Sequence, residues 1–432
     1  MQDANPVRRS SAPSLDDSAA VRIAVYTMRA GGSCSSSMLR DRPGDGALAD
    51  AGEPSLGRGD ADGRARPAAL VVSEISDRAS FAALATEWNA LVVASSDQLF
   101  YRHEFLRTWL EHFAATKAWR VLIARNQHGT LVGALPLLHE RTRMYGLPMR
   151  QLVAAANPHS CRFDLIATEP AKVSEAFLEH LLRDDGWDLL RLTDVPEGGA
   201  ARMLEQCARA QRLPVGIWHS LDSPYIPLPT THQALLATLP AKFLANCRRR
   251  RKKLEQHGAV TLERVEGGPL LSARLAEAFA LEQSGWKGER GTAIAQDPAT
   301  RAFYAELARV AAARGWLALY FLRCAGRAVA FQFGLTYAAR YLLLKPAYDE
   351  SLKPCSPGQL LMHEVVRDCI ARGLGEVDFL GPDMIWKRDW TDRTRVHEWI
   401  FVFRNTTLGR ALHQAKFGWV FAARERLRRW NR

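Results

Sequence analysis

Residues 341–390 combine amino acids that could bind a phosphate with others that could handle a proton. Ser356-Pro357-Gly358-Gln359 predicts the start of a helix, because Ser suits the N-cap, Pro the first helical position and Gln the third, as in a capping box. The N-terminus of a helix presents unpaired N–H groups and a positive dipole end, which attract anions. Since Gly358 has no side chain to keep an anion away, the pattern predicts a phosphate cradle.

Strands and a helix must hold this cradle in place. Residues 341–344 have the length and composition of a short apolar strand, and the polar stretch behind it, which contains proline, predicts a loop. The helix that starts at Pro357 carries an apolar stripe, and Gly373 is placed to end it. Residues 376–380 follow as a second strand. The expected unit is therefore strand, loop, helix and strand.

Four segments of this unit resemble the BioF2-like or CelD-like branch of the GNAT acyltransferase superfamily. They are KPAYDE, SPGQLL, VDFLGPD and Lys387-Arg388-Asp389-Trp390, and a weaker likeness extends from about residue 70 to residue 410. GNAT proteins hold the acyl-CoA pyrophosphate in the loop before this helix, on a motif of Gln or Arg, two residues, Gly, one residue, and Gly or Ala. Lys353-Pro354-Cys355-Ser356-Pro357-Gly358 has that spacing, with Lys at the first position and Ser at the first Gly.

The resemblance implies roles for individual residues. For binding of the acyl-CoA it implies Lys345, Lys353, Ser356, Gly358 and Gln359. Tyr348 would protonate the leaving thiolate, as a tyrosine does in many GNAT enzymes. For binding of the acceptor it implies Trp286 and Lys287, which lie in a Gly-Trp-Lys-Gly segment typical of the family, together with Lys387 and Trp390. Each of these residues could instead be structural or part of the solvated surface.

Transfer of an acyl group from a thioester to an amine also needs a base that takes the ammonium proton. A carboxylate with a raised pKa can serve. Glu282, just before Trp286, is one candidate. Asp378, at the carboxyl end of the predicted second strand, is the other, and Asp349 is a weaker third.

The seven cysteines predict neither a disulfide framework nor a metal site. Their number is odd and none of them forms a Cys-x-x-Cys pair, so we expect reduced thiols. His159, Cys161 and Asp164 lie close together in the chain, but no further ligand or base follows at suitable spacing. We therefore expect no metal and no cysteine nucleophile.

The chain is basic, with 58 Lys and Arg against 46 Asp and Glu and a net charge of +12. Such a charge favours polyanionic partners: CoA phosphates, nucleotide-linked substrates, RNA or an anionic membrane face. The densest basic run, residues 248–253, lies on a helix predicted over residues 239–257. It could be a solvated face, a site for a phosphate-bearing substrate or for the ribose phosphate of CoA, or a nucleic-acid site. No RNA-binding signature accompanies it. FemAB-like relatives use aminoacyl-tRNA, however, so tRNA stays open as a partner.

The chain divides into two similar halves. The turn glycines Gly129 and Gly326, 197 residues apart (326 minus 129), each lie in a predicted hairpin that is followed by strand, helix and strand. We expect an α/β fold of two tandem GNAT-like domains with mixed sheets flanked by helices, as in FemAB-like transferases. Only the second half has the cradle, because the first has Glu169-Pro170-Ala171-Lys172 at the corresponding place.

Composition and pattern set the expected boundaries of these parts. Residues 1–67 are rich in Ser, Gly, Ala, Asp and Arg and predict a disordered tail. Residues 68–235 form the expected N-terminal GNAT-like domain, residues 236–407 the C-terminal GNAT-like acyltransferase domain, and residues 408–432 a basic helix. That helix could lie on an anionic membrane surface or pack against the second half. No apolar run approaches the roughly 20 residues of a membrane span, so we expect no transmembrane helix and a cytoplasmic location.

The expected activity is direct transfer of an acyl group, most simply acetyl, from acyl-CoA to an amine or hydroxyl. The branch resemblance implies sugar or cell-envelope polysaccharide metabolism. Two alternatives stay open: an aminoacyl-tRNA-dependent FemAB-like transferase, and a non-catalytic accessory protein of polysaccharide synthesis that keeps the fold.

Overall fold

The structure, a computed structural model, describes residues 70–285, residue 291 and residues 293–419. The predicted tail over residues 1–67 lies outside the described residues, and so do Trp286, Lys287 and the end of the predicted C-terminal helix. No described helix is long and apolar enough to cross a membrane.

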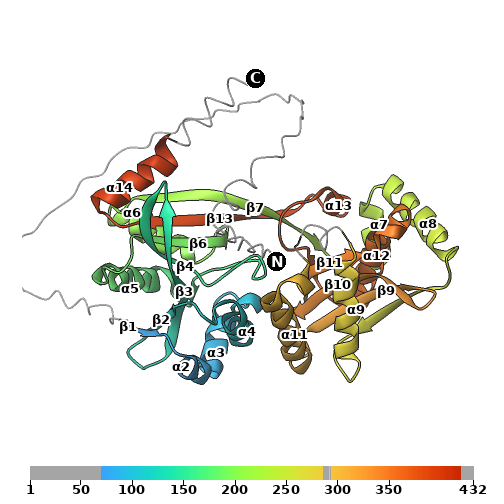
Figure 1. Ribbon diagram of the computed structural model, residues 1–432, viewed down its shortest axis with the longest axis horizontal. Helices are drawn as coiled ribbons and strands as arrows, with labels where there is room; N and C mark the ends of the chain where they lie inside the picture. The colour runs from blue at the N-terminus through green and yellow to red at the C-terminus, as the bar shows by residue number, and fades with distance from the viewer. Residues whose placement is uncertain (1–69, 286–290, 292, 420–432) are drawn as a thin grey trace, which may run out of the picture. The chain divides into compact units, whose positions relative to one another are not determined.

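The described strands join into one mixed sheet (Figure 1). Their order is β1-β2-β3-β4-β6-β13-β7-β12-β11-β10-β9-β8, and β5 pairs with β3. The bounds are β1 Val71–Ile75, β2 Trp119–Arg125, β3 Leu131–Met144, β4 Leu147–Ala154, β5 Ile166–Ala167, β6 Leu189–Pro196, β7 Val215–Pro227, β8 Val260–Val265, β9 Leu317–Cys324, β10 Arg327–Tyr337, β11 Arg340–Tyr348, β12 Glu376–Asp378 and β13 Thr394–Phe403.

Each half contains the predicted hairpin, strand, helix and strand. In the first half β2 and β3 form the hairpin, and β4 and β6 are parallel strands joined across helix α5 (Pro170–Arg183). In the second half β9 and β10 form the hairpin, and β11 and β12 are parallel strands joined across α12 (Pro357–Ala371). The α/β fold expected from the sequence, a mixed sheet flanked by helices, is confirmed.

The last strand of each half pairs with the other half. β7 follows α6 (Ala201–Ala210) of the first half, yet its end pairs with β12 of the second. β13, which follows β12 in the chain, pairs with β6 of the first half. The two exchanged strands also pair with each other along most of their length, and Figure 1 shows them side by side. The two parts of the sheet are therefore continuous through β13 and β7.

Helices bury both faces of the sheet. One hydrophobic cluster joins helices from both halves, α2 to α4 and α9 and α11, and its rings include Phe105 and Phe303 with centroids 5.9 Å apart. Separate clusters lie under α5 and α6 and under α8 and α12. The bounds of the other helices are α2 Arg78–Ala83, α3 Ala85–Ala94, α4 His103–Phe113, α7 His232–Thr238, α8 Ala241–Glu255, α9 Leu271–Gln283, α11 Pro298–Ala313, α13 Ile385–Arg388 and α14 Thr407–His413, with short turns at η1 Leu99–Tyr101, η2 Ile294–Gln296, η3 Glu350–Cys355 and η4 Gln414–Trp419.

One local prediction in the second half is wrong. The stretch after Leu344 is not a loop, because β11 continues to Tyr348 and pairs with β10 over these residues. Pro346 fits there since the ladder to β12 has already ended at Leu342. Residues 163–165 do not extend β5, and the Asp164 carboxylate accepts from the N–H groups of Ala200 and Ala201 at the start of α6.

Candidate functional site

Strands β11 and β12 part where the predicted cradle begins. Their parallel ladder runs only from Arg340 opposite Glu376 to Leu342 opposite Asp378. Beyond it β11 continues for six residues, whereas the chain after β12 turns at Leu380 and Gly381, with φ of 49° and 60°. The start of α12 lies close to the end of β11. This arrangement places a helix N-terminus beside a gap in the ladder.

The helix starts where the sequence predicted, but without a capping box. Ser356 is the N-cap of α12 in a left-handed conformation (φ 48°, ψ 55°), and its side chain makes no cap hydrogen bond to the described helix. An N-cap side chain normally reaches the helix from an extended backbone, which Ser356 lacks. Gln359 is used elsewhere: its amide donates to the Trp386 carbonyl at 3.0 Å and accepts from Trp390 Nε1 at 2.7 Å. The first-turn N–H groups of α12 therefore receive no cap from either side chain.

Gly358 and Tyr348 meet at this helix start. A Cβ atom at position 358 would lie 3.3 Å from Cδ1 of the Tyr348 ring, so the glycine lets β11 approach the helix. Burial, with the charge of Glu350, raises the pKa of Tyr348, which keeps the phenol protonated at neutral pH. Lys353 is exposed in η3, just before the helix. Gly358 and Tyr348 therefore meet at the end of β11, and Lys353 lies in the turn just before the helix.

Asp378 ends β12 in a buried ionic cluster. Its carboxylate accepts from Arg162 Nη2 at 2.6 Å, from Arg395 Nη1 at 3.1 Å and from the Leu380 N–H at 2.9 Å. Burial raises the pKa of Asp378, but the two arginines and the N–H group outweigh that effect and the pKa is lowered overall. This is opposite to the raised pKa expected of a general base. The contacts favour a positioning role for Asp378 between the two halves.

Lys387 and Trp390 lie inside the protein. Lys387 Nζ donates to the carbonyls of Leu380 at 2.6 Å and Pro382 at 2.7 Å, and burial lowers its pKa to about 8. These bonds hold the turn after β12. Trp390 is buried against Phe243 and donates to Gln359. Both side chains therefore bond to segments beside the cradle, Lys387 to the turn after β12 and Trp390 to Gln359 of α12. The sequence had predicted that they contact the acceptor.

Glu282 and Lys345 occupy different surroundings. Glu282 is buried at the end of α9, where Oε2 accepts from the Ile294 N–H at 2.9 Å. Lys345 Nζ lies 5.6 Å from the centre of the Tyr304 ring. Burial, together with the charge of Lys345, lowers the pKa of His159 to about 3. Glu282 is thus joined to η2, and Lys345 lies beside Tyr304 of α11.

Burial raises the pKa of Cys161 to about 11, although the charge of Lys345 opposes this effect. A thiol with such a pKa is protonated at neutral pH, which disfavours a nucleophile. Within the described part of the chain, no group of three or more His, Cys, Asp or Glu side chains is placed to hold a metal ion.

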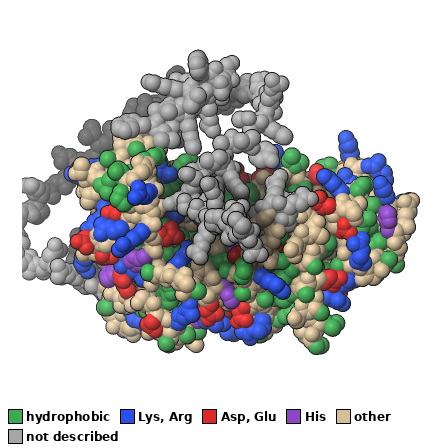
Figure 2. All heavy atoms as spheres, viewed as in Figure 1, with side chains coloured by type: hydrophobic (Ala, Val, Ile, Leu, Met, Phe, Trp, Pro, Cys, Tyr) green, Lys and Arg blue, Asp and Glu red, His purple; other side chains and the backbone are tan. Residues whose placement is uncertain are grey.

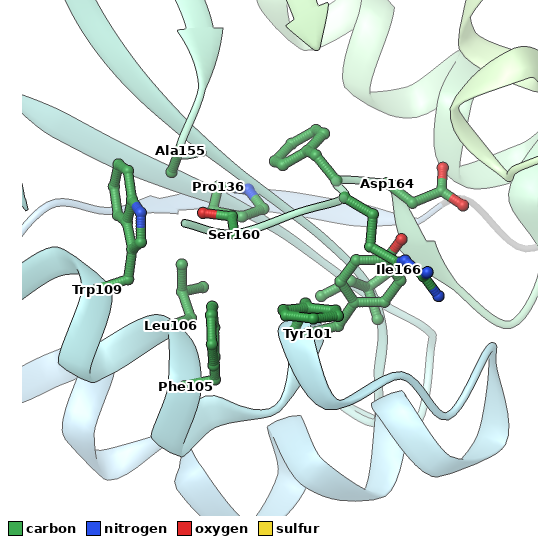
Figure 3. A pocket seen from close by; sticks show the side chains of 12 residues that line it. Tyr101, Phe105, Leu106, Trp109, Pro136, Ala155, Ser160, Asp164 and Ile166 are labelled. Carbon is green, nitrogen blue, oxygen red and sulfur yellow. The ribbon is translucent and has the colours of Figure 1, made fainter. Parts of the chain in front are cut away.

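Two hollows lie beside the loop that carries Arg162. The smaller holds only about 20 Å³, room for about one water, between rings such as Phe105 and Trp109 (Figure 3). The larger is a cleft of about 450 Å³, which we call the arginine cleft. Its polar lining comes from both halves: Ser95, Ser96, Gln98, Arg162, Asp164, Glu197, Arg340, Arg395 and His397.

Sequence reasoning missed the arginine cleft. Arg162 and Asp378 are 216 residues apart, and no motif surrounds either arginine that pairs with Asp378. A possible signal was the pair Arg395 and His397, whose alternation places both on one face of a strand. The pair can be recognised as part of a site only when it is known that β13 pairs with β6 of the first half.

Comparison with known proteins agrees with this architecture. A family model described as Acetyltransferase (GNAT) domain matches residues 241–388, from α8 to α13. The crystal structure of FemX is 12% identical with a TM-score of 0.51, over 79% of this chain and 100% of FemX. A tandem GNAT protein from the clavulanic acid biosynthesis pathway is 13% identical with a TM-score of 0.43, over 76% of this chain and 98% of that one. No curated protein matches the sequence.

At these identities the structural likeness concerns the fold alone. The family match is independent of it and covers β11, α12 and β12, the elements that form the cradle. Residues 241–388 therefore match a GNAT acetyltransferase domain, and the chain shares its α/β fold with FemX.

Proposed function

We propose that this protein transfers an acyl group, most simply acetyl, from acyl-CoA to an amine or hydroxyl acceptor. The observation that carries the proposal is the start of α12 beside the end of β11. There neither Ser356 nor Gln359 caps the first-turn N–H groups, Gly358 leaves room, and Lys353 supplies a cation. These are the requirements of a pyrophosphate site at a helix N-terminus.

The proposed reaction is direct. The acceptor nitrogen or oxygen attacks the thioester carbonyl carbon, an amide or ester bond forms, and the carbon–sulfur bond breaks. Tyr348 is protonated and lies at the helix start, so it is suited to give a proton to the departing thiolate. Glu282 remains the candidate that takes the proton of the acceptor. The protein would otherwise contribute position and hydrogen bonds to the developing oxyanion.

The first experiment is a calorimetric titration of the full chain with CoA and acetyl-CoA. Gly358→Glu puts bulk and negative charge beside the pyrophosphate, so the affinity should fall at least tenfold, or by about 1.4 kcal/mol. Gly375→Glu is the matched control, because Gly375 is exposed beyond the other end of α12 and a Cβ there would meet only Ala339 O, at 3.9 Å. Equal affinities in wild type and a folded Gly358→Glu variant would refute the placement.

The branch resemblance supports an acceptor from sugar or cell-envelope polysaccharide metabolism. Purified enzyme should then release thiol from acetyl-CoA when amino sugars are added, and an unreactive protein that still binds CoA would indicate the non-catalytic alternative. That outcome separates loss of turnover from loss of the cofactor site.

An aminoacyl-tRNA-dependent reaction is the second candidate, and one observation favours it. Five basic side chains are exposed on α8, which packs beside η3 at the cradle: Lys242, Arg248, Arg249, Lys252 and Lys253. Figure 2 shows Lys and Arg side chains at that end of the molecule, where Figure 1 places α7 and α8. If tRNA binds there, its affinity should fall steeply with salt and with alanine at Arg248, Arg249 and Lys252. Acyl transfer that needs no RNA would exclude this candidate.

A further inference from the structure

The arginine cleft contains two buried nitrogen atoms without a partner among the described residues. They are Nε of Arg162 and Nε2 of His397, whose residues are 5% and 1% exposed. A buried polar atom that stays unpaired destabilises the fold, so nearly all such atoms in proteins have a partner. Both residues line the same hollow of about 450 Å³, a volume typical of small-molecule sites. A ligand in the cleft is a candidate partner for both atoms.

The ring of His397 can only accept a hydrogen bond from such a ligand. Its Nδ1 lies 3.1 Å from the carbonyl oxygen of Arg395, and a carbonyl accepts, so Nδ1 carries the proton. Burial, and then the charge of Arg162, lower the pKa of His397 and keep the ring neutral. Nε2 therefore presents a lone pair, and its partner must be a donor such as an amine or a hydroxyl.

Three guanidinium groups line the cleft with His397, and they differ in their partners. Arg162 and Arg395 are partly neutralised by Asp378, and Arg162 also donates to Gln98 Oε1 at 3.1 Å. Arg340 donates to a neutral carbonyl, that of Asp97, at 3.0 Å. A guanidinium has five N–H donors, so Arg340 and Arg162 keep donors to offer.

Two carboxylates also line the cleft, those of Asp164 and Glu197. Burial raises the pKa of Asp164 to about 6, although the N–H groups of α6 oppose this effect, so its negative charge is weakened. Arg162 and Arg395 are already paired with Asp378, and Arg395 also with Glu376. Among the described residues Arg340 forms no ion pair, so it is the cation of the cleft that remains for a small anionic group.

We propose that the arginine cleft binds the acyl acceptor: a small molecule whose amine or hydroxyl donates to His397 Nε2 and whose carboxylate or phosphate is held by Arg162 and Arg340. The proposal rests on the proposed acyltransferase function. Arg162 and Arg395 line the cleft and both pair with Asp378, which ends β12 where β11 and β12 part, so the cleft and that gap share these three side chains. His397 and Arg340 are then binding residues that set acceptor specificity.

The test measures binding without acyl-CoA, so it does not depend on turnover. The full chain is titrated calorimetrically with 4-aminobutyrate and phosphoethanolamine, and with butylamine and ethanolamine as partners that lack the anion. The anionic amines should bind at least tenfold more tightly than their neutral partners. Carboxylate and phosphate probes distinguish the two kinds of anionic group.

Two variants and a matched control locate the binding. His397→Phe keeps a ring but removes the acceptor, and Arg340→Met removes a half-buried cation; each should weaken the anionic amines at least tenfold. Arg309→Met removes an exposed arginine of α11 and should change nothing. In wild type labelled with ¹⁵N-histidine, the Nε2 resonance of His397 should shift toward lower frequency when the ligand donates to it.

The outcomes separate this proposal from the proposed function. Equal affinities in wild type and both cleft variants, or no saturable binding of any anionic amine to wild type, would overturn it. Unchanged CoA binding in His397→Phe, together with loss of the anionic amines, would support it. If wild type fails to bind CoA, the proposed function falls, whereas the cleft titration still reports on ligand binding.

Discussion

Asp378 ends strand β12 between two arginines that come from distant parts of the chain. Arg162 belongs to the loop after β4, and Arg395 lies on β13, where its guanidinium stacks 3.7 Å from the centre of the Tyr225 ring. A carboxylate held in this way stays ionised and points its oxygens at cations. Asp378 is therefore better suited to holding the two arginines in position than to taking a proton from the acceptor.

Asp378→Asn should therefore destabilise the fold, because a buried Arg162 would lose its counter-charge. Loss of one partner of a buried ion pair costs about 3–5 kcal/mol, measurable by urea denaturation. Asp383→Asn is the control: its partner Arg388 is exposed, so the loss should stay below about 1 kcal/mol. A variant at Asp378 as stable as wild type would contradict the positioning role.

Glu282 offers a cleaner test of proton transfer. Glu282→Gln keeps an oxygen that can accept from the Ile294 N–H, so the fold should persist. Without a carboxylate to take the proton, turnover should fall by roughly 100-fold or more. Steady-state kinetics and CoA calorimetry check this together, and full activity would remove Glu282 from the mechanism.

Individual elements hold the cradle in shape. Helix α12 starts at Pro357 next to the end of β11, and the turn after β12 is fixed from behind by Lys387. This turn contains Leu380 in a left-handed conformation, which a branched side chain rarely adopts. The lysine bonds and the Leu380 N–H bond to Asp378 together stabilise that conformation.

Lys387 should make the stability of this element depend on pH. Its pKa is lowered from 10.5 to about 8, so between these values the unfolded chain binds more protons than the folded one. Stability must then rise with pH across that window. The difference in unfolding free energy between wild type and Lys387→Met should increase by on the order of 3 kcal/mol from pH 8 to 10.5. Arg388→Met should show no such trend, and a flat difference for Lys387→Met would contradict the assignment.

At the scale of the whole molecule, the exchanged strands make the two halves interdependent. Ile400 and Val402 of β13 lie in the same cluster as Leu190 and Leu192 of β6. The first half alone lacks β13 and would expose this part of its core. Our division at residue 235 therefore describes the repeat in the sequence, and we propose that folding does not follow it.

A fragment of residues 68–235 should not unfold cooperatively when heated. Mixing it with residues 236–432 should restore β6–β13 pairing and with it a cooperative transition, detected by circular dichroism. The full chain is the control. A sharp transition in the isolated first fragment would show that β13 is dispensable to it.

Several features of this protein followed from the sequence by itself. The hairpins around Gly129 and Gly326, the start of α12 at Pro357 and the repeated strand–helix–strand order are encoded in turn residues and in periodicity. These signals are local, so they survive without knowledge of the rest of the chain. The α/β fold class followed from them.

Tertiary structure alone decided the pairing of β7 with β12 and of β13 with β6. The sequence of β7 contains Gly216, Asp222 and Pro224, which weaken its strand pattern, and partners on both edges stabilise it. The same long-range pairing places His397 and Arg395 in one cleft with Arg162. Gln359 accepts a hydrogen bond from Trp390 and does not form the predicted capping box. These contacts join residues that are from 31 to more than 200 positions apart in the chain. They depend on which surfaces the folded chain buries together, and a local sequence pattern does not contain that information.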